Sequence, residues 1–436
     1  MPRDSLRQAL AAVPGSADVA IIGRDTRVRL NQARYADAGA RMAGRTVVLS
    51  ADGQLEAALA MIALDGVAHR MVVCPPDLST DYRDVIAARV GSEGIVANAE
   101  IGTADAARAP DIVTEWVLLT SGTSGVPKTV RHTLATLTAA IKPRPPGDND
   151  IIWGTYYDIR RYGGLQIFLR ALLGGHSLVL SDAHEPMTEF LTRAGACGVT
   201  HLTGTPSHWR SALMSQTISA IAPRYVRLSG EIADQPVLDA LRVAFPKARI
   251  VHAYASTEAG VGFEVTDEKA GFPAAFVEEP QVGFDMRVVD GALHIRSDRA
   301  ALDYIGSGEA PLHDAEGFVD TGDMVERRGE RYYFVGRRGG IINVGGAKVH
   351  PEQVEAVINS VPGVRLSQVK AKSNPIVGAI VVANVVAAGP FEPAALKEAI
   401  LSTCRAELAE HKVPVIVTFV ADLPLTPTGK LRRTNG

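Results

Sequence analysis

The segment 118–130, LLTSGTSGVPKTV, combines the residue types that bind an anion. Its glycines let neighbouring backbone N–H groups turn towards one point, its hydroxyls add donors, and Lys128 adds a positive charge. Such a loop suits a polyphosphate. It departs from the Walker A motif, because Pro127 stands where that motif, counted from Gly122, has a glycine followed by lysine. The spacing disfavours a P-loop ATPase and leaves a flexible Ser/Gly surface turn as the alternative.

A second segment, 253–260, has the sequence AYASTEAG. The aromatic face of Tyr254, the hydroxyl of Thr257 and the carboxylate of Glu258 could serve a purine ring, a phosphate and a magnesium ion respectively. The alternative is the start of a helix capped by Ser256 or Thr257. Taken alone, the segment favours this helix start over a nucleotide-binding site.

Two further segments place charge in loops. The sequence DTGD at 320–323 offers carboxylates in a tight turn, which either bind a ribose diol or are simple turn residues. The segment 423–433, LPLTPTGKLRR, presents Lys430 directly after a glycine, and a lysine in such a place is ordinarily solvated.

Alternating elements must position these segments. Short β-branched runs alternate with Ala- and Leu-rich stretches of helical length, so the strands need crossover connections and the sheets are predicted to be largely parallel. This is an α/β fold. The expected strands lie at 45–50, 70–74, 177–180 and 249–251, and the expected helices at 54–64, 165–173 and 237–244.

Towards the C-terminus the pattern changes. Residues 281–335 consist of short strands and tight turns, which predict a small antiparallel subdomain. The Gly- and Arg-rich stretch RRGGIINVGG then resembles a hinge, so we place a domain boundary near Gly339, between an N-terminal domain of residues 1–338 and a small α+β lid domain of residues 339–436. In the latter we expect helices at 351–359 and 392–409 and strands at 379–386 and 415–420.

Composition excludes several classes of protein. The 436 residues include 45 Lys and Arg against 48 Asp and Glu, and a net charge of −3 gives no general affinity for nucleic acid or an anionic membrane. With 46% hydrophobic residues, the chain is not disordered throughout. The longest uncharged apolar stretch, 376–391, is too short to span a membrane and is predicted to be a buried strand.

The cysteines and the N-terminal residues indicate the cellular compartment of the protein. Cys74, Cys197 and Cys404 are far apart in sequence, which argues against a metal site or a disulfide framework and for a reducing environment. The first 22 residues carry mixed charge and a proline, and make a poor signal peptide. We therefore expect a cytoplasmic protein.

Taken together and in this order, the segments resemble the adenylate-forming superfamily of acyl-CoA synthetases, stand-alone adenylation enzymes and luciferases. TSGTSGVPK is similar to the family's phosphate loop, YASTE to its YGxTE motif and DTGD to its TGD motif. GRRGGIINVGGAKVHPEQVE is similar to its hinge, and PLTPTGKLRR to its PxTxxGKxxR motif. The resemblance runs from about residue 45 to the C-terminus.

The resemblance implies a role for each matching position. The phosphate loop would hold the β- and γ-phosphates of ATP through Thr120, Ser121, Gly122, Thr123, Ser124, Gly125 and Lys128. Gly230 and Glu231 would line the adenine and acyl pockets, and Tyr254 would stack on adenine. Thr257 would contact the α-phosphate and Glu258 would hold Mg²⁺. Asp323 would accept the ribose hydroxyls beside Arg337, and Lys430 would reach the substrate carboxylate and α-phosphate.

The implied reaction joins two anions, because a carboxylate attacks a phosphate, so cationic groups must stabilise the transition state. Lys430, on a mobile domain, would act in this step and withdraw for the second one. A thiol, from CoA or from the phosphopantetheine of a carrier protein, then attacks the acyl-adenylate after a rotation about the hinge.

The chain departs from the family pattern in three places. Gly339 stands where the family has Asp or Lys at the hinge, and Ala255 replaces the glycine of YGxTE. The region before the hinge is also short, which suggests a small or open acyl pocket.

The substrate is less well defined by sequence. Arg161 aligns with a His or aromatic position of the family's acyl-pocket helix, with Tyr162 beside it, so its guanidinium could pair with a second carboxylate of the substrate or face solvent. Asp158 only approaches the position that binds the ammonium group in enzymes activating amino acids. We therefore favour an aryl or short acyl acid.

Three activities share these motifs. The favoured one is a carboxylate–thiol ligase that uses ATP and CoA. The second is a stand-alone enzyme that loads an acyl-carrier protein, and the third is adenylation of a non-carboxylate oxyanion such as nitrite. A non-catalytic nucleotide-binding homologue is disfavoured because Lys128, Glu258 and Lys430 are all present.

Overall fold

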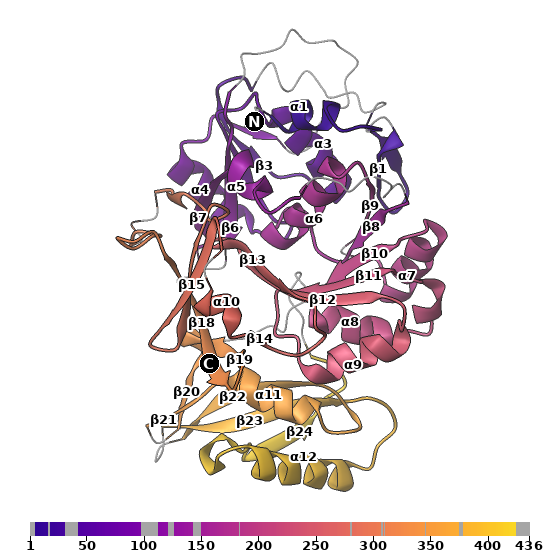
Figure 1. Cartoon of the computed structure of the whole chain (residues 1–436), viewed down its shortest axis with the longest axis vertical. Helices are drawn as coiled ribbons and strands as arrows, with labels where there is room; N and C mark the ends of the chain where they lie inside the picture. Colours follow the sequence, from indigo (N-terminus) through magenta and orange to yellow (C-terminus); the bar gives the residue numbers. More distant parts are fainter. Residues whose placement is uncertain are drawn as a thin grey trace.

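The computed structural model describes residues 5–15, 18–30, 42–96, 112–120, 126–142, 150–182, 184–279, 281–306, 308, 310–344, 346–374 and 378–423. Two large sheets occupy the N-terminal part of the chain, and a smaller α+β unit lies at the opposite end of the molecule, in orange and yellow in Figure 1. Among the described residues, no helix is long and apolar enough to cross a membrane.

The larger sheet has eight strands in the order β13-β12-β11-β10-β8-β9-β1-β2. All neighbouring strands are parallel except β13 and β2, which are antiparallel at the two edges. The strands are β1 Ala20–Ile22, β2 Arg27–Arg29, β8 Ile152–Thr155, β9 Ser177–Leu180, β10 His201–Gly204, β11 Tyr225–Ser229, β12 Arg249–Ser256 and β13 Gly260–Val265.

The second sheet has six strands in the order β17-β7-β6-β4-β3-β5. Its centre is parallel, and β7 and β17 are added antiparallel at one edge. The strands are β3 Thr46–Leu49, β4 Arg70–Val73, β5 Gly94–Val96, β6 Glu115–Thr120, β7 Lys128–Thr133 and β17 Asp303–Tyr304. The predicted parallel α/β architecture is confirmed.

Helices connect these strands, as the crossover rule requires. Several begin at a capping side chain: Ser79, Thr205 and Asp234 each accept a hydrogen bond from a backbone N–H of the first turn. The helices are α1 Leu6–Ala11, α3 Gln54–Leu64, α4 Thr80–Val90, α5 Leu134–Thr138, α6 Tyr162–Leu173, α7 Met187–Ala196, α8 Pro206–Leu213, α9 Gln235–Ala244 and α10 Ala275–Glu278, with a 3-10 helix at Ile218–Ala220.

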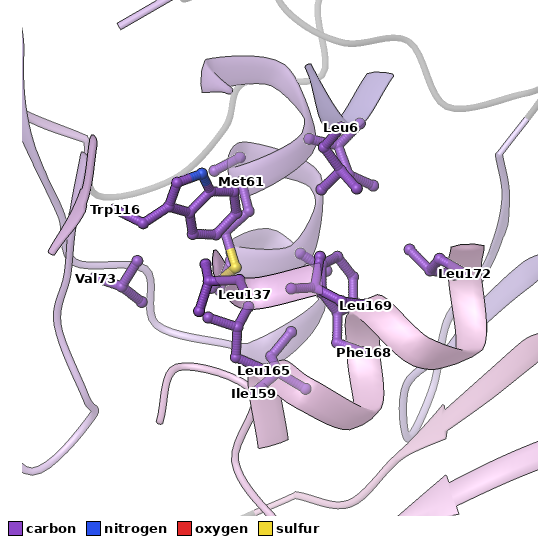
Figure 2. Packing of buried hydrophobic residues seen from close by; sticks show 14 of the residues in the cluster. Leu6, Met61, Val73, Trp116, Leu137, Ile159, Leu165, Phe168, Leu169 and Leu172 are labelled. Carbon is purple, nitrogen blue, oxygen red and sulfur yellow. The ribbon is translucent and has the colours of Figure 1, made fainter. Parts of the chain in front are cut away.

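Helix α6 contributes one face to the main hydrophobic core. Leu165, Phe168 and Leu172 recur at helical spacing and are fully buried. Figure 2 shows them in the same cluster as Met61 of α3 and Trp116 of β6. The helix is longer than predicted, because it begins at Tyr162 rather than at residue 165.

A five-stranded antiparallel sheet follows, in the order β14-β19-β18-β16-β15. The strands are β14 Phe272–Pro273, β15 Phe284–Val289, β16 Ala292–Ser297, β18 Val319–Arg328 and β19 Arg331–Arg337. The predicted antiparallel subdomain is present, but β17 within the same stretch pairs instead with β7 of the six-stranded sheet.

The C-terminal unit has its own core, which includes Val354, Val385 and Ile400. A 3-10 helix at Arg338–Gly340 separates β19 from it. Its elements are β20 Ile342–Val344, β21 Ala347–Val349, α11 Pro351–Asn359, β22 Val364–Asn374, β23 Gly378–Ala387, α12 Pro393–Glu407, a 3-10 helix at Glu410–Lys412 and β24 Ile416–Phe419. Four of these elements match the prediction, whereas β22 and the β20–β21 hairpin were not predicted.

Candidate active site

Three residues that lie far apart in sequence meet at one carboxylate. The Tyr254 hydroxyl donates a hydrogen bond to Asp323 Oδ2 at 2.7 Å, and Arg337 Nε donates to Asp323 Oδ1 at 2.8 Å. We call Tyr254, Asp323 and Arg337 the Asp323 cluster. A carboxylate has about four lone-pair positions, so Asp323 keeps acceptor capacity after making both bonds.

Strand irregularities place this cluster. The DTGD segment was predicted to be a tight turn, but it lies inside β18. His294 pairs with Asp320 and Ala292 with Met324, so one residue of β16 faces three residues of β18. Such bulges redirect side chains and are frequent beside active sites. The Asp323 carboxylate is thereby turned towards Tyr254.

The ring of Tyr254 lies in an aromatic stack. Its centroid is 5.2 Å from that of Phe334, with 10° between the planes, and 5.7 Å from that of Phe263. A Cβ atom added to Gly262 would lie 2.9 Å from Tyr254 Cδ1, so glycine allows this close packing. Burial and then the Asp323 carboxylate raise the pKa of Tyr254 well above its usual value. The phenol therefore remains a neutral hydrogen-bond donor.

Thr257 and Glu258 lie in the turn between β12 and β13. No helix begins here, so the helix-start alternative is wrong: the Ser256 side chain instead accepts a hydrogen bond from the N–H of Ala259 within the turn. Gly260 closes the turn with φ of +79°, and an added Cβ there would lie 2.3 Å from the Arg299 carbonyl oxygen. The turn is fixed by a position that admits only glycine.

His132, which sequence reasoning missed, connects this turn to β7. Its Nε2 lies 2.7 Å from the Thr257 carbonyl oxygen, and its Nδ1 lies 2.9 Å from Thr136 Oγ1. Burial lowers the pKa of His132 to about 4, so the ring is neutral at pH 7. Because a carbonyl only accepts, the proton is on Nε2. The histidine thus holds Thr257 against the strand that follows the predicted phosphate loop.

The ends of that loop are held together. Thr120, the last residue of β6, is directly opposite Lys128, the first residue of β7. Lys128 Nζ lies 5.0 Å from the ring centroid of Tyr304, and Arg89 donates a hydrogen bond to the Pro127 carbonyl at 2.9 Å. The predicted phosphate ligands Ser121, Gly122, Thr123, Ser124 and Gly125 lie outside the described residues.

Gly230 and Glu231 follow β11. Gly230 adopts φ of +85°, which explains the glycine at this position. Glu231 Oε2 accepts a hydrogen bond from the N–H of Ser207 at 2.9 Å, in the first turn of α8. A carboxylate is favourable there because the helix N-terminus carries partial positive charge.

The residues predicted to line the acyl pocket are buried or already have partners in the chain. Arg161 forms an ion pair with Asp77, rather than presenting an unpaired guanidinium. Tyr162 is buried, and its ring centroid is 5.6 Å from that of His132. Asp158 forms an ion pair with Arg160. Its Oδ2 is 2.6 Å from Nη2 of Arg160, and both side chains are buried.

Between α6 and the eight-stranded sheet lies a small cavity of about 20 Å³. Two arginines line it, Arg170 of α6 and Arg227 of β11, and neither was singled out from the sequence. The cavity also adjoins Ser229 and Ala255, next to Gly230 and Tyr254 respectively. It therefore borders the candidate site.

Lys430 lies outside the described residues. Beside the predicted hinge, Arg338 donates to Asp320 Oδ2 at 2.8 Å, and a Cβ added at Gly339 would meet no atom within 4 Å. Within the part of the chain that the structure describes, no group of three or more His, Cys, Asp or Glu side chains could hold a metal ion. A single carboxylate such as Glu258 still suits Mg²⁺ that arrives with phosphates, because this ion keeps most of its other ligands from water and substrate.

Comparison with known proteins decides the family. The model of the AMP-binding enzyme family matches residues 35–300, and that of the AMP-binding enzyme C-terminal domain matches residues 353–430. The chain belongs to the adenylate-forming family of AMP-binding enzymes.

Curated members of this family include an isonitrile lipopeptide synthase from Streptomyces coeruleorubidus, 30% identical over 346 residues, and the fatty acid–[acyl-carrier-protein] ligase MmaC from Mycobacterium marinum, 26% identical over 359 residues. Each alignment covers 73% of this chain, but 23% of the former protein and 67% of the latter.

The solved structure of the anthranilate CoA ligase AuaEII with anthranoyl-AMP has the same fold. It is 18% identical, with a TM-score of 0.79, and the match covers 98% of this AMP-binding enzyme and 95% of AuaEII. The fold class predicted from sequence is therefore confirmed, including the small C-terminal α+β unit.

Proposed function

We propose that the protein activates a carboxylic acid with ATP and transfers the acyl group to a thiol, with CoA as the favoured acceptor. The observation that carries this proposal is the Asp323 cluster, which joins Tyr254 of the AYASTEAG segment to Asp323 of DTGD and Arg337 at the hinge. His132 then connects the Thr257 turn to the strand that Lys128 begins. Four separate segments of the chain thus converge on one site.

The Asp323 cluster is the nucleoside half of the site. Asp323 accepts the two ribose hydroxyls with the lone pairs that Tyr254 and Arg337 leave available. Tyr254 keeps the adenine-stacking role that its motif implies, and its packing against Phe334 and Phe263 orients the ring. Gly230, without a side chain, admits the base beside Glu231.

The phosphate half is the loop and the Thr257 turn. The loop residues Thr120 to Gly125 and Lys128 bind the β- and γ-phosphates, and the Thr257 hydroxyl donates to the α-phosphate. Glu258 binds the Mg²⁺ that accompanies ATP. The His132 hydrogen bond fixes the Thr257 backbone, so this hydroxyl is held in place before the nucleotide binds.

In the first step a carboxylate oxygen of the acid attacks the α-phosphorus, and pyrophosphate leaves. Lys128 and Lys430 balance the negative charge that accumulates on the phosphates. Lys430 belongs to the unit that we place at residues 339–436, which acts as a mobile lid pivoting near Gly339. In the second step the thiolate attacks the acyl carbonyl and AMP leaves.

CoA and the phosphopantetheine of a carrier protein are the two candidate thiol acceptors. MmaC is named a carrier-protein ligase and AuaEII a CoA ligase, so this fold and family accommodate both. Adenylation of a non-carboxylate oxyanion is the third possibility, because the phosphate-binding residues do not contact the attacking group.

The test measures ATP-dependent pyrophosphate release across aryl, acyl and amino acids, with hydroxylamine as a trap and with or without CoA. Release that depends on one acid, with a thioester when CoA is added, supports the ligase. Hydroxamate without a CoA thioester points to a carrier protein. Absence of pyrophosphate with every acid contradicts the proposal.

A further inference from the structure

The cavity beside the candidate site is built by one face of α6. Gly163, Gln166, Ile167 and Arg170 all line it, and their spacing of three, four and seven positions puts them on one side of the helix. The opposite side carries the leucines and the phenylalanine of the core in Figure 2. The helix therefore has an apolar face towards the core and a partly polar face towards the cavity.

Strand residues form the opposite wall. Arg227 and Ser229 alternate along β11, so their side chains point to the same side of the sheet, and Ala255 and Val261 come from β12 and β13. At about 20 Å³, the cavity holds about one water molecule, or one small polar group in its place.

The charge around this cavity is positive. Arg227 is buried and forms an ion pair with Glu264. Arg299 donates to the carbonyl oxygens of Val261 and Gly262. Arg170, by contrast, has no ion pair with any carboxylate among the described residues, and burial together with the nearby charges of Arg227 and Arg299 lowers its pKa to about 10.

A guanidinium left without a counter-ion in such a place is costly, because desolvation is not repaid by an ion pair. Proteins keep such groups where a ligand supplies the missing charge. The planar fork of arginine matches a carboxylate with two parallel hydrogen bonds. An ammonium group would be repelled at the same position.

We propose that Arg170 is the specificity-determining residue of the acyl pocket, and that the acid activated by this enzyme is short and carries a second carboxylate, which binds Arg170. This inference rests on the proposed function, since it assigns the acid of that same site. It also replaces the sequence-based assignment of this role to Arg161, whose charge is neutralised by Asp77.

The test uses acids of equal length that differ at the far end: succinate, butyrate and 4-aminobutyrate, with glutarate and terephthalate as longer diacids. Pyrophosphate release is measured for the natural enzyme, for Arg170→Gln and for Arg170→Lys. Arg242→Gln is the matched control, because Arg242 lies on α9 outside the cavity and pairs with Glu268. We expect kcat/KM at least tenfold higher for a diacid than for its monoacid.

In Arg170→Gln we expect that preference to fall at least tenfold, through a lower kcat/KM for the diacid, and in Arg170→Lys we expect it to recover in part. Equal use of diacid and monoacid by the natural enzyme, or an unchanged preference in Arg170→Gln, overturns the inference while leaving the ligase function intact.

A calorimetric titration with succinate, glutarate and terephthalate separates this inference from the activity. Binding of a diacid that Arg170→Gln loses and Arg242→Gln retains supports the anion site even if no acid releases pyrophosphate, an outcome that contradicts only the proposed function. Absence of diacid binding to the natural enzyme overturns the inference.

Discussion

His132 Nε2 lies 2.7 Å from the carbonyl oxygen of Thr257, a residue 125 positions away in the sequence. The hydrogen bond joins β7 of the six-stranded sheet, which follows the predicted phosphate loop, to the turn at the end of β12 in the eight-stranded sheet. In the proposed mechanism Thr257 and Lys128 act on the same triphosphate, and this neutral histidine would fix the spacing between those two parts of the site.

The low pKa of His132 predicts how stability varies with pH. The pKa is about 4 in the folded protein and 6.5 ordinarily, so the unfolded chain binds more protons between these values. The contribution of His132 is present above pH 6.5 and is lost as pH falls towards 4, a change of about 3 kcal/mol in unfolding free energy.

Urea denaturation of the natural enzyme and of His132→Gln at pH 7 and pH 5 measures this effect. We expect the natural enzyme to lose more stability than the variant on going to pH 5. Parallel losses in the two proteins would show that the histidine is not buried and neutral.

Removing the charge of Asp323 should weaken ATP binding. In Asp323→Asn we expect the KM for ATP to rise at least tenfold while the KM for the acid stays constant, because the amide loses one oxygen acceptor and the pairing with Arg337. Asp320→Asn is the control, since it keeps an oxygen for the Gly322 N–H and its ion pairs, with Arg338 and His294, lie outside the Asp323 cluster. Similar KM values for ATP in both variants would contradict the ribose assignment.

Lys128→Met should lower the rate of pyrophosphate formation by about a hundredfold, because a positive group near the leaving phosphates is removed. Lys247→Met provides the control, since Lys247 is exposed in the turn that follows α9. Steady-state pyrophosphate release compares the two. Activity equal to that of the control would place the triphosphate elsewhere.

Lys430→Ala should remove most adenylation and leave thiolysis of a supplied acyl-adenylate nearly intact, because Lys430 is proposed to act only in the first step. The two half-reactions are followed separately, by pyrophosphate release and by thioester formation. Equal loss of both refutes this division of labour.

The turn that carries Thr257 and Glu258 predicts a pair of glycine variants. Gly260→Ala meets both an unfavourable positive φ and the Arg299 carbonyl oxygen at 2.3 Å, so we expect a loss of at least about 3 kcal/mol in stability, with loss of activity. Gly329 also has a positive φ, but open space around it, so Gly329→Ala should cost about 1 kcal/mol. Equal costs, measured by denaturation, would mean that the turn can rearrange.

The elements best predicted from sequence are those whose ends are determined locally. Helix α3 runs over the predicted residues 54–64, and α11 begins, as expected, at Pro351, which suits the first turn of a helix. Strand β22 was missed because its second half, KAKSN, is polar, and its pairing with β23 decides its structure. Neighbouring strands likewise convert DTGD from a turn into a bulge.

The motifs of the site could be found from sequence because their residue types are chemically distinctive. The links between them could not. His132 reaches Thr257 in the turn that follows β12 of the other sheet, and nothing in KTVRHT distinguishes it from a solvent-exposed histidine on a strand. Arg161 and Arg170 are both arginines of the same segment, and which of them has a carboxylate partner depends on Asp77, far away in the chain.

The two faces of α6 have a consequence for redesigning the enzyme. Positions 163, 166, 167 and 170 line the cavity, and the side chains at 165, 168 and 172 belong to the core. Ile167 belongs to the core cluster as well, and the buried Gln166 donates a hydrogen bond to the Leu137 carbonyl oxygen at 3.0 Å. A mutant library confined to positions 163 and 170 can therefore change the cavity with the least loss of folded protein. Randomising positions 165, 168 and 172 would unfold the protein before any change of substrate preference emerged, because substitutions of buried core residues lower its stability.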